Sequence, residues 1–134
     1  METTVQALPG GVTAYDRQWG AAAHASALLL ALLSSWLVGI AGAVAAFVVW
    51  MVVRDRSAFA AAHAREALNF NVSMFIYAAI SVALLVFTLG IGLIVLAPLW
   101  VVLGLMWLVC SLVATFHAYD GRQYRYPLTI RLFR

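Results

Sequence analysis

Charged residues are scarce in this 134-residue chain: they occupy 10% of its positions, while 66% are hydrophobic. A soluble domain has about 25% charged and about 45–50% apolar residues. Two long stretches, residues 18–53 and 67–119, contain no charged residue at all. A small soluble domain buries only about two-thirds of the surface that its unfolded chain exposes, too little to cover so much apolar surface. The scarcity of charge therefore excludes a soluble fold and indicates a membrane protein.

Lysine is absent, and all eight basic residues are arginines. They flank the apolar stretches and form no basic stripe with interleaved aromatic residues, so we expect contact with anionic lipid headgroups and no nucleic-acid partner. The single cysteine, Cys110, excludes an internal disulfide. The apolar stretches also contain no carboxylate, and intramembrane hydrolysis needs paired carboxylates or a nucleophile with a base. We expect no enzymatic activity.

The apolar stretches are long enough for four transmembrane helices, because one crossing takes about 20 apolar residues. The longer stretch holds two crossings, predicted at residues 62–87 and 93–119. The shorter stretch breaks at Gly39 into a helix over residues 19–38 and a short one over residues 40–53. At about 20 Å the short helix either thins the bilayer, continues through the turn or is re-entrant, and we favour a short crossing.

The arginines predict the orientation of these helices. With four crossings, an N-terminal tail (residues 1–16), the loop after residue 53 and a C-terminal tail (residues 120–134) lie on one side of the membrane, together with all eight arginines. The other side carries no charged residue. By the positive-inside rule this is an all-α, multi-pass protein of a bacterial inner membrane, with a transmembrane domain over residues 17–119 and both termini in the cytoplasm.

Polar residues form a stripe on the helix predicted at residues 62–87, which begins in the membrane interface. At 100° per residue they fall within about a third of the helix circumference, and such groups face other helices or water rather than lipid. The stripe predicts either hydrogen bonds between helices or a hydrophilic groove for a polypeptide, a lipid headgroup or a proton. Its acid is expected to meet Arg17 or an arginine of the C-terminal tail. The stripe residues are His63, Glu66, Asn69, Ser73 and Tyr77.

A second set of residues is expected at the level of the lipid headgroups, as a membrane anchor or a docking site for a partner. Tyrosines beside arginines are typical of that level. The set consists of Arg17, His24, Tyr124, Arg125 and Tyr126. The histidines could ligate haem, but the chain has no haem motif and no histidine pair at zinc-ligand spacing, so we predict no metal and no cofactor.

Three strings resemble a family of small bacterial four-helix membrane proteins: RQWGAAAHASALL (residues 17–29), HAREALNFN (63–71) and GRQYRYPLTIR (121–131). That family is related to the twenty-kilodalton subunit of the chloroplast inner-envelope import translocon, which contributes to a protein-conducting channel. The resemblance covers about residues 15–131. It implies a structural or translocation-related subunit of a membrane complex, with further copies or other membrane proteins as partners. The alternative is a lipid- or small-ligand-binding protein, with His24 and His63 framing a headgroup.

The predicted orientation can be checked in intact cells with an impermeant probe. A tag at the N-terminus should not react with the probe, because the arginines hold that end in the cytoplasm. A matched tag inserted at residues 88–92, in the uncharged turn, should react. Labelling of the N-terminal tag would contradict the predicted topology.

Overall fold

The computed structural model describes residues 11–34 and 39–134, which form four helices and, within those residues, no strand. The all-α prediction is therefore confirmed. Two of the helices are long and apolar enough to cross a membrane, α3 (Ala58–Phe87) and α4 (Leu93–Tyr119). The other two, α1 (Ala14–Leu33) and α2 (Ile40–Val53), do not meet that requirement within the described residues. Four complete crossings are therefore not confirmed.

The bounds of α2 and α4 are those predicted from the sequence, whereas α1 and α3 begin earlier. The first turn of α3 starts after Ser57, whose Oγ accepts a hydrogen bond from the Ala60 N–H at 3.0 Å. The first turn of α1 starts after Thr13, which exchanges hydrogen bonds with Asp16 in a capping box. These caps satisfy N–H groups that a helix start leaves free. The far end predicted for the first helix, residues 35–38, lies outside the described residues.

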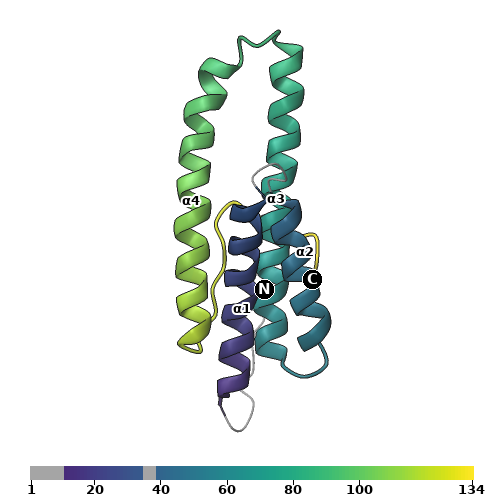
Figure 1. The fold of residues 1–134 in the computed structure, drawn as a ribbon, viewed down its shortest axis with the longest axis vertical. Helices are drawn as coiled ribbons and strands as arrows, with labels where there is room; N and C mark the ends of the chain where they lie inside the picture. The colour runs from purple at the N-terminus through teal and green to yellow at the C-terminus, as the bar shows by residue number, and fades with distance from the viewer. Residues whose placement is uncertain (1–10, 35–38) are drawn as a thin grey trace.

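The helices form two hairpins of unequal height (Figure 1). Gly39, at the start of α2, packs against the backbone of Asn71 and Phe75, near the middle of α3. From Asn71 to the end of α3 at Phe87 is a further distance of about 24 Å. We call the end that holds residues 54–57 and 120–122 the base, and the turn at residues 88–92 the tip. The α1–α2 hairpin covers the half of α3 and α4 nearer the base, and only α3 and α4 reach the tip (Figure 1).

The core lies entirely in the half nearer the base. In α3 the buried side chains fall between Ala60 and Met74, and in α4 between Ser111 and Ala118. No side chain between residues 75 and 110, all of which the structure describes, is buried. Many core residues are alanines, which allow membrane helices to approach closely. They include Ala23, Ala46, Ala60, Ala64, Ala67, Ala114 and Ala118.

The half nearer the tip exposes apolar side chains on every side. Its most exposed residues are Phe87 (87%), Leu89 (91%) and Ile94 (78%). A cleft of about 340 Å³ separates the two helices there, and apolar side chains such as Val82 and Leu96 line it. Apolar surface of this extent is stable only when lipid or another apolar surface covers it.

Gly42 fixes how closely α2 approaches its neighbours. A Cβ atom at this position would overlap Asn71 Oδ1 and would lie 3.0 Å from the Ala27 carbonyl oxygen of α1. Asn71 cannot easily move away, because its Nδ2 donates to the Ala67 carbonyl at 2.9 Å. Asn71 Oδ1 itself is buried without a hydrogen-bond partner among the described residues. The position therefore requires glycine.

Gly42→Ala should destabilise the protein by about 1–3 kcal/mol, because a methyl group is forced into a filled contact. Thermal unfolding in detergent, followed by circular dichroism, measures this as a lower Tm. Gly104→Ala is the matched control, because a Cβ there meets nothing within 4 Å. An equal fall in Tm for both variants would show that close packing at Gly42 is not the cause.

Candidate functional site

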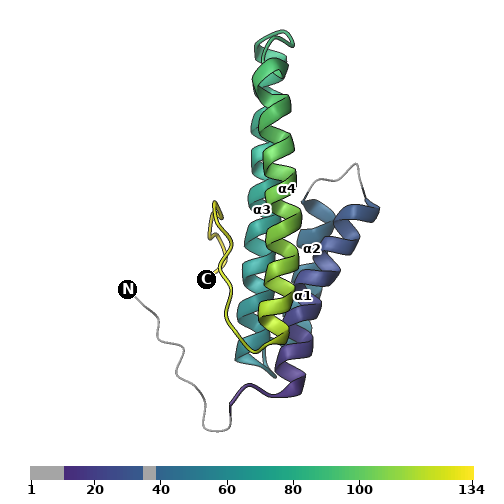
Figure 2. The same ribbon diagram turned by 90° about the vertical axis from the view of Figure 1, so that its left-hand side faces the viewer.

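The C-terminal tail, residues 120–134, turns back from the base and lies along α3 (Figure 2). It is on the opposite side of α3 and α4 from the α1–α2 hairpin (Figure 2). Gly121 makes the first reversal with a φ of 75°, and Leu128 makes a second one with a φ of 55°. Glycine adopts such positive φ angles at little cost. The tail has no helix or strand of its own, so its position depends on the contacts that it makes.

The polar stripe of α3 provides most of those contacts, through side chains that bind the backbone of the tail. Glu66 Oε1 accepts from the Tyr126 N–H at 2.9 Å, and Ser73 Oγ accepts from the Ile130 N–H at 2.8 Å. Asn69 binds Phe133 twice, since its Oδ1 accepts from the backbone N–H at 2.9 Å and its Nδ2 donates to the carbonyl at 2.8 Å.

Two further residues complete the stripe. The Tyr77 hydroxyl donates to the Leu128 carbonyl, and His63 Nε2 contacts the Arg122 carbonyl at 3.1 Å. All five residues predicted as a polar groove thus lie on one face of α3 and bind the same segment of chain. The extended backbone of the tail pairs with no strand, so its N–H and C=O groups need other partners, and the side chains of the stripe provide them. The groove is filled by the tail of the protein itself.

Beneath the tail, two histidines and a tyrosine form a buried chain of hydrogen bonds. His24 of α1 and His63 of α3 are joined by a 2.8 Å contact between Nε2 and Nδ1, and the Tyr126 hydroxyl lies 2.9 Å from His24 Nδ1. The two histidines are 0% and 1% exposed, and Tyr126 is 3% exposed. The chain connects α1, α3 and the tail within the core.

The donor and acceptor roles along this series of hydrogen bonds follow from its last acceptor, the Arg122 carbonyl. A carbonyl can only accept, so His63 Nε2 donates to Arg122, and on a neutral ring His63 Nδ1 then accepts from His24 Nε2. His24 Nδ1 is left to accept from the Tyr126 hydroxyl. Burial raises the pKa of that hydroxyl, which keeps it protonated as a donor. Every polar atom of the chain is satisfied in this one arrangement.

Aromatic packing holds Tyr126 in place. Its ring stacks on Phe70 of α3, with the centroids 4.0 Å apart and the planes 11° from parallel. Tyr124 meets it edge-on at 5.2 Å, and His117 of α4 lies 5.3 Å from Tyr124. Such pairs add about 0.5–1.5 kcal/mol beyond the burial of their area. The tail is thus fixed between α3 and α4 as well as to the stripe.

The carboxylates of the described residues are all engaged. Glu66 pairs with Arg131 at 3.0 Å, so its partner is an arginine of the tail and not Arg17. Asp120 pairs with Arg122 at 2.7 Å, and Asp55 pairs with Arg54 at 3.3 Å. Asp16 is held in its capping box.

Among the described residues, no three His, Cys, Asp or Glu side chains lie together in a way that could hold a metal ion.

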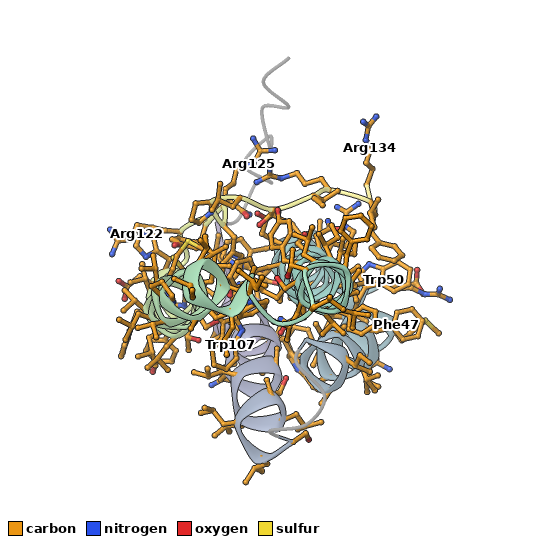
Figure 3. The ribbon with its side chains drawn as sticks, turned by 90° about the horizontal axis from the view of Figure 1, so that it is seen from above. Phe47, Trp50, Trp107, Arg122, Arg125 and Arg134 are labelled. Atoms are coloured by element: carbon orange, nitrogen blue, oxygen red, sulfur yellow. The ribbon has the colours of Figure 1, made fainter. Side chains whose placement is uncertain are left out.

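The residues predicted to lie at the level of the lipid headgroups fall into an exposed group and a buried group. Arg17 and Arg125 are exposed near the base, and Arg125 points away from the helices together with Arg122 and Arg134 (Figure 3). Tyr124 is half-buried. His24 and Tyr126 lie in the core instead of at the surface.

The direct bond between His24 and His63 leaves no space between their rings for a lipid headgroup. In this structure the two rings therefore bind each other and the tail, and the ligand-binding alternative stays a prediction. The residue that sequence reasoning missed is Phe70, on which Tyr126 stacks. A phenylalanine in an apolar helix gives no indication in the sequence that it stacks on a tyrosine of the tail.

The fold and the tail-filled groove define a small all-α protein with two helices apolar enough to cross a membrane, whose polar residues bind its own C-terminus. Residues 15–133 match the model of the MamF/MmsF family, described as the magnetosome magnetite crystal formation protein family. The match covers most of the chain, which therefore belongs to this family. Neither the curated proteins nor the solved structures yield a match.

This family is a small membrane-protein family, which agrees with that part of the sequence resemblance, but nothing found links the chain to the chloroplast import translocon. The groove that a passing polypeptide would use contains the tail.

Tyr126→Phe should lower stability by about 1–3 kcal/mol, because it leaves His24 Nδ1 buried without a donor while it keeps the aromatic stack. The fall in Tm in detergent measures the loss, and faster cleavage by trypsin at Arg125 and Arg131 reports release of the tail. Tyr119→Phe is the control, since Tyr119 is 62% exposed. Unchanged stability of Tyr126→Phe would contradict the assigned direction of the hydrogen-bond chain.

Proposed function

We propose that this protein is a non-enzymatic structural component of the bacterial membrane in which magnetite crystals form. Its membership of a family described by magnetite crystal formation supports the process. The observation that carries the structural role is that the polar stripe of α3 is bound to the chain's own tail. The side chains best placed for chemistry are thereby used to hold the fold together.

Two features support a role in the membrane over direct contact with the mineral. The turn at the tip, residues 88–92, carries no carboxylate, and the carboxylates of the described residues lie toward the base, each with a hydrogen-bond partner. The half nearer the tip instead offers a large apolar surface on α3 and α4. Such a surface suits lipid and neighbouring membrane proteins, including further copies of this chain.

The proposed orientation places the base, with its arginines, in the cytoplasm. The start of the tail and the loop at residues 54–57 then lie at the headgroups of the cytoplasmic leaflet. Arg54 stacks over Trp50, with 5.4 Å between the guanidinium carbon and the ring centroid, an arrangement suited to that level. In this orientation α3 and α4 cross the membrane and the tip reaches its other face.

The proposal can be tested in a magnetite-forming bacterium that lacks its own proteins of this family. Expression of this chain should increase the size of the crystals, measured by electron microscopy, toward that of the parent strain. Tyr126→Phe should restore less, because it loosens the tail from the groove. A wild-type chain that is present in the crystal-bearing membrane but leaves crystal size unchanged would contradict the proposal.

The acidic residues at the surface provide the matched control. A chain with Asp55→Asn and Asp120→Asn loses two exposed carboxylates but keeps the stripe and the core. It should restore crystal size as well as the wild type does. Failure of this variant, while it remains in the membrane, would mean that the protein acts through mineral-binding carboxylates.

A further inference from the structure

The cross-section of the protein differs between its two halves. Near the base, four helices and the tail lie side by side, whereas near the tip only α3 and α4 remain (Figures 1 and 2). The change occurs about halfway along α3, where Gly39 packs on Asn71. Since a helix with its side chains is about 10 Å across, the area of the half nearer the base is about twice that of the other half.

The change of cross-section falls within the half of the bilayer nearer the base, because Asn71 and Phe75 lie about 6 Å and about 12 Å beyond Ala67 along α3. The charge-free part of α3, from Ala67 to Phe87, is about 30 Å long, which equals the hydrocarbon thickness. Residues 58–66, which include Arg65 and Glu66, then lie at the interface. The start of α2 at Ile40 reaches only the level of Asn71 and Phe75, so the α1–α2 hairpin enters one leaflet and turns back within it.

The outer surface of that hairpin is apolar, so it displaces lipid rather than water. Four leucines of α1 and six residues of α2 are exposed, among them Phe47 (44%) and Val48 (54%). Phe47 and Trp50 project outward from the α2 side of the molecule, at the right of the view in Figure 3. Apolar groups that enter a single leaflet respond to the curvature of the membrane.

We propose that the protein is a curvature-sensitive membrane wedge that favours bilayers in which the leaflet around its base is convex. The wider half fits the leaflet whose headgroups are spread apart, and the narrower half fits the compressed one. With the base in the cytoplasm, the favoured membrane bulges into the cytoplasm, as the membrane of an internal compartment does. This property follows from shape alone and does not depend on a role in magnetite formation.

The test uses the full-length purified chain in zwitterionic phosphatidylcholine vesicles of large and small diameter. All eight arginines lie outside residues 67–119, toward the base, so trypsin added outside cuts only chains whose base faces outward. Complete digestion in detergent gives the total. The ratio of outward to inward chains should rise by about twofold or more in the small vesicles, because their outer leaflet is convex. An equal ratio at both diameters, or a lower ratio in the small vesicles, would overturn the proposal.

A pair of variants with identical chemistry separates shape from other causes. Phe47→Ala with Val48→Ala trims the wide half, and Phe87→Ala with Val86→Ala trims the narrow half by the same atoms. All four side chains are exposed, so both variants should fold, which circular dichroism checks. The first pair should weaken the dependence on diameter, and the second should preserve or strengthen it. If the two double variants change the dependence on vesicle diameter equally, the wedge mechanism is contradicted. Neither result bears on the proposed role in magnetite formation, which has a separate test.

Discussion

The structure depends on the binding of an extended C-terminal tail to a polar stripe on α3, a helix long and apolar enough to cross a membrane. A segment without a helix or strand leaves its backbone N–H and C=O groups unpaired, and each such group that is buried costs about 1–3 kcal/mol unless it finds a partner. Glu66, Asn69 and Ser73 provide such partners by binding the backbone at Tyr126, Phe133 and Ile130. Without the tail, the same side chains would lose these hydrogen-bond partners.

The histidines connect this binding to the rest of the fold. His24 brings α1 to the stripe through His63, and both share their hydrogen bonds with the tail. Near the base, α1, α3 and the tail are therefore held by one chain of polar contacts, and a core of small residues packs the helices together. In the half nearer the tip, Trp100 Nε1 donates to Ser81 Oγ at 3.0 Å between α4 and α3, and a cleft lies between the two helices beside this contact. The unequal cross-section follows from helix length, because α1 and α2 have 20 and 14 residues whereas α3 and α4 have 30 and 27.

The sequence predicts the helices well because their signals are local. Charge-free length and glycine positions identify residues 40–53 and 93–119 as helices, and the periodicity of α3 identifies the five stripe residues. The occupant of the groove could not be predicted. The tail is recognised mainly through its backbone, which leaves no side-chain pattern, and the pairing of His24 with Tyr126 joins residues 102 apart in the chain. The point along α3 at which the α1–α2 hairpin ends likewise depends on the packing of Gly39 against Asn71 and Phe75, which a local sequence pattern cannot predict.

Hydrogen exchange of the tail amides in lipid nanodiscs tests the docking of the tail most directly. The N–H groups of Tyr126, Ile130 and Phe133 donate to the stripe, so they should exchange far more slowly than those of an unstructured peptide. Ser73→Ala should speed exchange at Ile130 most. Exchange of all three amides at the rate of a free peptide, while the helices remain protected, would contradict a tail bound in the groove.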